Sequence, residues 1–395
     1  MADLPFDVTD ERLAAAAWTR LAEAGDLAAG LLRAALGASG ALDWLCHAAR
    51  QGPAAAAARP SWMSAGEASQ ARWSQSVARW LPRLPDLDIR RELDVLASLG
   101  GRLVVPAEPQ WPAALDDLGA AAPAALWLRG HGRLTDLRRT AAVVGARAST
   151  GYGEHVAAEL ASGLAGSGVV VVSGGAYGID AAAHRGALSR DAPTCAVLAG
   201  GVDRLYPAGN TALLERILDD GLVVAEFPPG SAPTRWRFLQ RNRLIAALGQ
   251  VCVVVEAAWR SGALNTANHA AGLLRPVAAV PGPVTSMASA GCHRLLRESD
   301  AVCVTDAAEV LELLAPIGDH LPTEPAVAPG LLDGLDPVAG RLLDAMPARG
   351  AATPQSLARA GGLSPEEVRS GLGRLELAGE VQRHGSGWRR ARDDR

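Results

Sequence analysis

Short apolar runs alternate with stretches of helical spacing from Thr140 to about residue 315. The predicted strands are residues 141–144, 169–172, 194–198, 222–225, 251–255, 277–280 and 301–304. These runs are continuously apolar, and helical patterns fit between them. Such an arrangement is typical of a parallel sheet that helices cover on both faces. We therefore predict an α/β fold whose ligand lies beyond the carboxyl ends of the strands.

The regions on either side of this block have different patterns and predict further domains. Residues 1–85 are rich in alanine, leucine and tryptophan at helical spacing, which predicts a small helical, SAM-like domain ahead of the core at 86–315. Residues 316–334 contain four prolines and little periodicity, as expected of a linker. Residues 335–395 combine short helical stretches with a strand–turn–strand, and this order predicts a winged-helix domain.

The charge of the chain restricts the kind of partner it can bind. The sequence contains no lysine, so all 38 basic residues are arginines, and the formal net charge is −4. A guanidinium can hold a phosphate through two parallel N–H groups. Because the whole chain is slightly acidic, any binding of nucleic acid must come from a local basic patch.

Several classes of protein are disfavoured by what the sequence lacks. No apolar run reaches the roughly 18 residues of a membrane span, and no basic segment precedes an apolar leader, so we expect a cytoplasmic protein without membrane contact. The five cysteines are scattered, and we expect them to be free thiols. No pair of histidines has the spacing of metal ligands, so we expect neither a metal nor a cofactor.

The first candidate site is formed by two loops that each follow a predicted strand. The segment Ser-Gly-Gly-Ala-Tyr-Gly at 173–178 leads into an alanine-rich helix, and the segment 145–150 leads into another. Free amides and a helix N-terminus attract an anion, and glycines allow its close approach. The candidate phosphate-binding residues of these loops are Gly145, Arg147, Ser149, Thr150, Ser173, Gly174, Gly175, Ala176 and Gly178.

A cluster of arginines at 235–243 is the second candidate. It contains four arginines within nine residues, and no acidic residue occurs between Glu226 and Glu256. A solvated helix face would normally interleave glutamates, so the cluster predicts a positive patch on an otherwise acidic protein. From this segment we add Arg237, Arg241, Asn242 and Arg243 to the phosphate-binding set. Glu226 and Glu256 each end a strand, and we expect both at the rim of the site, where they either position arginines or repel a second anion.

Aromatic and hydroxyl side chains supply candidates for the rim of the site. The three tyrosines fall in loops flanked by glycine or proline, where they either stack on bases or tether the loops through their hydroxyl groups. The rim candidates are Tyr152, Tyr177, Tyr206, Phe238, Ser261 and Thr266. Asp180 and His184 share a helix face, and we interpret them as a helix-start residue and a buried histidine rather than as a catalytic pair.

Known catalytic and nucleotide-binding patterns do not match these loops. The segment after the first strand is not Gly-x-Gly-x-x-Gly, no acidic residue ends the second strand, and Ser173 lacks the Gly-x-Ser-x-Gly elbow of hydrolases. A nicotinamide enzyme and a serine hydrolase are therefore disfavoured. We predict no catalytic residue.

Seven motifs follow one another in a characteristic order. They are Val-Gly-Ala-Arg-Ala-Ser-Thr-Gly-Tyr-Gly at 144–153, Ser-Gly-Gly-Ala-Tyr-Gly-Ile-Asp at 173–180, Ala-Gly-Gly-Val-Asp-Arg-Leu-Tyr-Pro at 199–207, Glu-Phe-Pro-Pro-Gly at 226–230, Arg-Asn-Arg at 241–243, Ser-Gly-Ala-Leu-Asn-Thr-Ala at 261–267 and Val-Pro-Gly-Pro-Val at 280–284. Together they resemble the DNA-processing protein DprA (Smf) family.

The resemblance implies an extended Rossmann-like core that binds single-stranded DNA, forms a homodimer through that core and is not an enzyme. It further implies protection of incoming strands during natural transformation and loading of the RecA recombinase. The alternative is a nucleotide phosphoribohydrolase of the related Rossmann type, whose loop Pro-Gly-Gly-x-Gly-Thr-x-x-Glu this chain lacks. In the predicted winged helix, Glu366 and Glu367 begin the helix that would enter a DNA groove, so a protein-contact role is at least as consistent as duplex binding.

Overall fold

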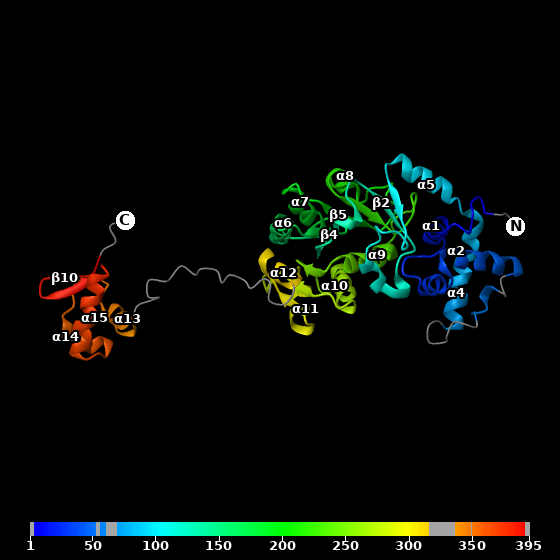
Figure 1. The fold of residues 1–395 in the computed structure, drawn as a ribbon. Coiled ribbons are helices and arrows are strands. Elements are labelled where there is room, and N and C mark those ends of the chain that lie inside the picture. The colour runs from blue at the N-terminus through cyan, green and yellow to red at the C-terminus, as the bar shows by residue number, and fades with distance from the viewer. Residues whose placement is uncertain (1–3, 53–55, 61–68, 316–335, 349, 392–395) are drawn as a thin grey trace. The chain divides into compact units, whose positions relative to one another are not determined.

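A nine-stranded sheet forms the centre of the larger part of the chain (Figure 1). The structure is a computed structural model, and it describes residues 4–52, 56–60, 69–315, 336–348 and 350–391. The strand order is β1-β2-β6-β5-β4-β3-β7-β8-β9. The strands are β1 (Arg102–Val104), β2 (Leu126–Arg129), β3 (Thr140–Val144), β4 (Val170–Ser173), β5 (Thr194–Leu198), β6 (Leu222–Ala225), β7 (Val251–Val254), β8 (Val277–Ala279) and β9 (Val302–Cys303).

The strands from β3 to β9 pair in parallel, and β1 and β2 extend the sheet in antiparallel register beyond β6. All seven strands predicted from the apolar runs are present, which confirms the parallel α/β core. β3 lies between β4 and β7: strands β4 to β6 are added on one side of β3, and strands β7 to β9 on the other. Such a switch point is where open α/β sheets leave a crevice for a ligand.

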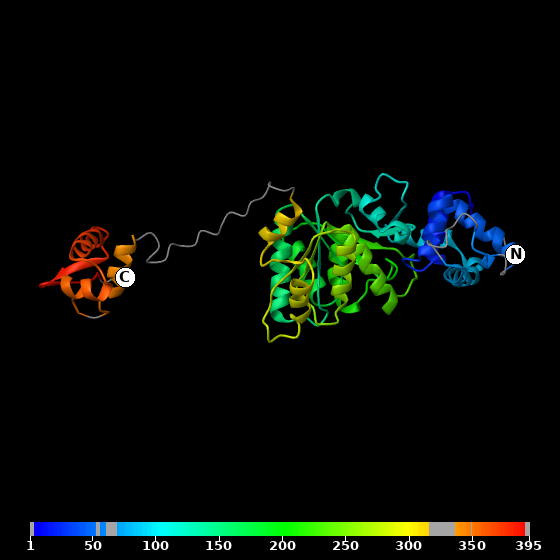
Figure 2. The same cartoon turned by 90° about the horizontal axis from the view of Figure 1, so that it is seen from below.

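Helices cover both faces of the sheet (Figure 2). The helices of this region are α6 (Gly151–Gly166), α7 (Ile179–Leu188), α8 (Thr211–Asp220), α9 (Arg235–Leu248), α10 (Gly262–Gly272), α11 (Ala290–Glu298) and α12 (Ala307–Leu314). Successive residues of β3 pack against different helices. Ala141 and Val143 belong to the apolar cluster of α6, α7 and α12, whereas Ala142 and Val144 belong to that of α9 and α10. Successive strand residues point to opposite faces, so both faces are apolar.

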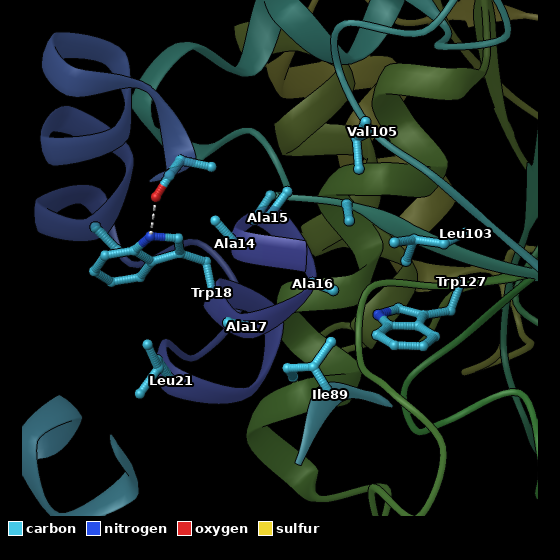
Figure 3. Packing of buried hydrophobic residues seen from close by; sticks show 14 of the residues in the cluster. Ala14, Ala15, Ala16, Ala17, Trp18, Leu21, Ile89, Leu103, Val105 and Trp127 are labelled. Atoms are coloured by element: carbon cyan, nitrogen blue, oxygen red, sulfur yellow. Dashed lines mark hydrogen bonds between the residues drawn. The ribbon is translucent and has the colours of Figure 1, made fainter. Parts of the chain in front are cut away.

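The N-terminal helices belong to the same compact unit as the sheet, which comprises residues 1–322. They are α1 (Glu11–Leu21), α2 (Leu27–Gln51), α4 (Gln70–Trp80), the 3-10 helix Leu81–Asp86 and α5 (Ile89–Ser98). Trp18 and Trp73 each meet Trp80 edge to face, with ring centroids 5.3 and 5.7 Å apart. The indole N–H of Trp18 donates to Ala38 O, and Trp18 packs with the alanines of α1 (Figure 3). Trp127 of β2 donates to the hydroxyl of Thr19 at 3.1 Å, which joins α1 to the sheet.

The second compact unit comprises residues 323–395. It contains α13 (Pro337–Ala345), α14 (Pro354–Gly361), α15 (Pro365–Leu377) and the hairpin β10 (Val381–His384) to β11 (Gly387–Arg390), the order of a winged helix. The linker predicted at 316–334 lies outside the described residues, and the domain boundary at residue 85 stays a prediction. Among the described residues, no helix combines the length and apolarity required to span a bilayer.

Close contact between α6 and α7 depends on a glycine. A Cβ built on Gly186 would lie 2.3 Å from the backbone oxygen of Ala158, so α7 can approach α6 only without a side chain there. We predict that Gly186→Ala lowers the free energy of unfolding by about 1–3 kcal/mol, because the helices must separate. Urea denaturation measures the loss. The matched control is Gly166→Ala in the last turn of α6, where a Cβ meets nothing within 4 Å. This variant should raise the free energy of unfolding by about 0.5 kcal/mol.

Candidate functional site

A groove of about 790 Å³ opens beyond the carboxyl ends of the strands next to the switch point. Its walls come from the β3–α6 loop at 145–148, from the first three turns of α9, and from the segment 258–266 that ends in α10. We call it the strand-end groove. Of the predicted site residues, it is lined by Gly145, Arg147, Ala176, Tyr206, Phe238, Arg241, Asn242, Ser261 and Thr266. These residues span about 120 positions of sequence and meet only in the fold.

Arginines and aromatic rings form the wall of the groove. The guanidinium carbon of Arg147 lies 4.4 Å from the ring centroid of Phe238, and that of Arg241 lies 5.9 Å from it. The ring of Tyr206 is tilted against Phe238 with centroids 5.9 Å apart, and Tyr206 is 45% exposed. A cation over an aromatic face is attracted by the ring quadrupole, so Phe238 holds the exposed Arg147 at the groove.

Arg241 lies beneath this cluster and is 5% exposed. Its Nη1 donates to the Val197 carbonyl of β5 at 2.7 Å. A Cβ on Gly174 would lie 1.7 Å from the same Nη1, so Gly174 is needed to leave space for the guanidinium. Burial lowers the pKa of Arg241 to about 10, Asp180 opposes this shift and Arg147 adds to it, so the side chain remains charged at neutral pH. The floor of the groove therefore carries a fixed positive charge.

Asp180, in the first turn of α7, also reaches the groove and is 6% exposed. Burial raises the pKa of its carboxyl group, and the cations Arg241 and Arg147 together with the amides of Ala176 and Gly145 oppose that shift. The carboxylate of Asp180 therefore lies beside these amides and these two guanidiniums. It places a negative charge next to two of the loops that the sequence predicts to bind phosphate.

The other loop residues have structural partners. The hydroxyl of Ser173 is buried and donates to Val143 O at 2.6 Å, and that of Ser149 donates to Glu154 at 2.7 Å. Gly175 and Gly178 have φ angles of 65° and 76°, which favour glycine, and neither lines the groove. Close packing and backbone conformation thus account for these two glycines.

The start of α6 is occupied by another internal carboxylate. Thr150 caps the helix, and its amide and hydroxyl donate to Glu256 at 2.9 and 2.6 Å. Glu256 is 1% exposed, so the expectation that it lies at the rim was wrong. Its negative charge faces the helix end that the sequence offered to a phosphate, and Thr150 does not line the groove.

Half of the arginine cluster is paired with acids, contrary to the sequence-based expectation. Arg237 donates to both carboxylate oxygens of Glu23 at 3.1 Å and lies over the ring of Phe227. Arg243 is 2% exposed and donates to Glu226 at 2.5 Å. Glu23 comes from the N-terminal helices, a neighbour that local sequence does not reveal. Neither Arg237 nor Arg243 lines the strand-end groove.

The three tyrosines divide between the two roles left open by the sequence. The hydroxyl of Tyr152 donates to Pro281 O at 2.6 Å, and that of Tyr177 accepts from the Gly209 amide at 3.1 Å. Both therefore tether loops. Tyr206 contacts Phe238 and lines the groove instead.

The helix-face pair Asp180 and His184 does not form a catalytic pair. His184 is fully buried and its Nδ1 lies 2.8 Å from the Thr194 hydroxyl. Burial lowers the pKa of His184 to about 3, so the ring is neutral at physiological pH and serves packing. Within the described ranges, no group of three acidic, histidine or cysteine side chains is placed to hold a metal ion.

Arg235, Arg260 and Asn265 are among the lining residues that the predicted set lacked. Arg235 and Arg260 are exposed, and neither makes an ion pair within the described part of the chain. Asn265 accepts from Asn242, which also donates to Gly262 O and so fixes the start of α10. Arg235 belongs to the arginine cluster, so the sequence contained a signal for it. Arg260 stands alone in a loop, and only the fold brings it to the groove.

Comparison with known proteins agrees with this architecture. The sequence profile described as DNA recombination-mediator protein A matches residues 102–315, and the profile of the DprA winged helix domain matches residues 324–387. A DNA processing protein DprA of Mycobacterium tuberculosis is 51% identical over 310 residues, which cover 75% of this chain and 79% of that protein. The DprA of Streptococcus pneumoniae is 40% identical over 190 residues, or 48% of this chain and 66% of its own.

A solved structure shows the same fold. The X-ray structure of DprA from Streptococcus pneumoniae aligns with a TM-score of 0.55 and 33% identity over 62% of this chain and 86% of that one. Sheet, groove and winged helix together define a Rossmann-type DNA-processing protein. The chain belongs to the DNA recombination-mediator protein A (DprA) family.

The ion pair of Arg243 generates a test of its structural role. We predict that Arg243→Met lowers the free energy of unfolding by about 3–5 kcal/mol, because the buried carboxylate of Glu226 loses its partner. Arg147→Met, at an exposed position, should change it by less than about 0.5 kcal/mol. Urea denaturation of both variants gives the comparison. Equal stability of Arg243→Met and the parent chain would contradict the assignment.

Proposed function

We propose that the strand-end groove binds single-stranded DNA without regard to sequence. The observation that carries this proposal is the cluster in which Phe238 holds Arg147 above the charged floor of Arg241, beside the exposed ring of Tyr206. Exposed guanidiniums bind backbone phosphates, and aromatic rings stack on any base. The family membership supports the same conclusion, since this family processes DNA.

Single strands fit this site better than a duplex. An aromatic ring can stack on a base only where the base is free of its neighbours, as in a single strand. The groove offers arginines for phosphates, whereas its side chains of the kind that read base edges are largely engaged. Asn242 bonds to Asn265 and to Gly262 O, and the hydroxyls of Thr234 and Ser261 cap α9 and α10. Sequence-independent binding of an unpaired strand follows from this composition.

Binding rather than turnover is the role we assign to the groove. The carboxylate of Asp180 lines the groove beside the loops that would hold the phosphate of a mononucleotide, and a negative charge there repels such a phosphate. The phosphoribohydrolase alternative therefore has no support from the arrangement of the groove. We propose a non-enzymatic protein.

The wider process follows from the family. We propose that the chain protects incoming strands in natural transformation and loads the RecA recombinase on them. We also propose that it acts as a homodimer through the Rossmann core. Support for a dimer comes from the β9 edge of the sheet, where Val302 is 44% exposed, and from Leu274 before β8, which is 91% exposed. Exposed apolar side chains beside an open strand edge favour pairing with a second chain.

Salt dependence tests the phosphate contacts. We predict that the logarithm of the binding constant for oligo-dT falls linearly with the logarithm of salt concentration. Arg147→Ala and Arg260→Ala should each reduce the steepness of this line by about 0.7, because each removes one phosphate contact and the counterion release that accompanies it. Fluorescence anisotropy across a salt series measures the slope. Arg216→Ala is the control, since Arg216 lies beside Asp220 on α8, does not line the strand-end groove and should leave the slope unchanged.

Stacking is tested separately. Tyr206→Leu should weaken oligo-dT binding by about 1–3 kcal/mol, because the base loses its exposed aromatic platform, while the salt slope changes little. Duplex DNA of equal length serves as the comparison ligand. If the parent chain binds the duplex as tightly as the single strand, the assignment of the groove to an unpaired strand is wrong.

The role of Asp180 gives a further test. Asp180→Asn removes a negative charge beside Arg147 and Arg241 and should tighten oligo-dT binding about fivefold. Neither the parent chain nor the variant should release adenine from AMP, which chromatography of the reaction would detect. Release of adenine by the parent chain would establish the enzymatic alternative. Thermal unfolding checks that the variant remains folded.

A further inference from the structure

A second groove, of about 510 Å³, lies on the side of α9 that faces the N-terminal helices. We call it the α4–α9 groove. It is lined by residues 23–28, which lead into α2, by Arg72, Gln75, Ser76 and Arg79 of α4, and by Trp236 and Gln240 of α9. Arg235 and Leu239 of the same helix line the strand-end groove, so α9 is the wall between the two.

Trp236 is the unusual feature of this groove. Trp236 is 58% exposed, more than Trp259 at 47%, whereas Trp18, Trp73, Trp80 and Trp127 are buried in the core. Leaving so large an apolar ring in water forgoes the free energy that burial would provide. The packing of α9 does not require it, because residues 241–248 supply the buried face of the helix. A flat exposed ring at the opening of a groove is a platform for a base.

The charges around the groove favour an anionic ligand. The two carboxylates of the lining are already paired, Glu23 with Arg83 and Arg237, and Asp26 with Arg79 and the indole N–H of Trp80. Arg72 is exposed and has no ion-pair partner within the described residues. The lining itself contains two carboxylates and the guanidiniums of Arg72 and Arg79, and Arg83 and Arg237, which hold Glu23 from outside it, add two further positive charges.

The first turn of α9 connects the two grooves. It contains Arg235, Trp236 and Arg237 and no acidic residue. The first backbone amides of this 14-residue helix have no carbonyl partner within the helix. The N-terminus of a helix attracts phosphate. A helix with its side chains is about 10–12 Å wide, a distance that a polymer crosses in a few nucleotides.

We propose that the α4–α9 groove is a second subsite for single-stranded DNA, in which a strand leaving the strand-end groove crosses the first turn of α9 and stacks a base on Trp236. Arg72 and Arg79 take the next phosphate. The proposal rests on the proposed function of the strand-end groove. It makes the N-terminal helices part of the DNA-binding surface and predicts a longer binding site than the core alone provides.

The test compares oligo-dT of two lengths, about 5 and about 16 nucleotides, bound to the full chain. Trp236→Ala should leave affinity for the short strand unchanged and weaken binding of the long strand about 5- to 150-fold, the equivalent of one lost stacked base. Trp236→Phe keeps an aromatic platform and should restore most of the affinity. Arg72→Ala should reduce the salt slope by about 0.7 for the long strand only.

The outcomes separate this subsite from the strand-end groove. Unchanged binding of the long strand by Trp236→Ala overturns the second subsite, and a contact of Trp236 with a protein partner would then explain its exposure. An equal loss for both lengths also overturns it, because the indole would then belong to the first site. If the parent chain binds neither length, the proposed function itself fails. Because Trp236 is exposed, its removal should leave thermal unfolding unchanged, which is measured as the control.

Discussion

The buried guanidinium of Arg241 holds the site together. It extends from α9 on one face of the sheet, bonds to the Val197 carbonyl of β5, and occupies the space that Gly174 leaves at the end of β4. A charge removed from water is stable only where hydrogen bonds and opposite charges compensate it, and Asp180 supplies part of that compensation. The position of α9 relative to the strand ends is therefore fixed, and with it the position of Phe238 and Arg147.

The internal anion distinguishes this groove from a nucleotide site on the same kind of sheet. In Rossmann-type proteins the amides after a strand commonly receive a phosphate of the cofactor. Here the carboxylate of Asp180 lies beside the amides of Gly145 and Ala176. The exposed positive charge of the groove is carried by the side chains of Arg147, Arg235 and Arg260. Such a layout suits a strand lying along a surface better than a small molecule enclosed in a pocket.

One helix serves both stability and binding. On α9, Arg243 forms an ion pair beneath the surface with Glu226, and Arg237 is held by Glu23 from the loop between α1 and α2. Phe238 and Arg241 line the groove instead. Arg237 and Arg241 lie one turn apart on the same side of the helix, so their positions along the axis give them different neighbours. The N-terminal helices thus neutralise some of these charges and leave others for a ligand.

By itself, the sequence determined the parallel sheet, the helices between its strands, the winged helix and the family, because local apolar patterns and ordered glycine motifs encode them. It also located Arg147, Tyr206, Phe238 and Arg241, since strand ends converge on one edge of a parallel sheet. Only the tertiary structure decided which charges remain free. Glu23 and Asp180 act on arginines far from them in the chain, and a charge is neutralised by its neighbours in space rather than in sequence.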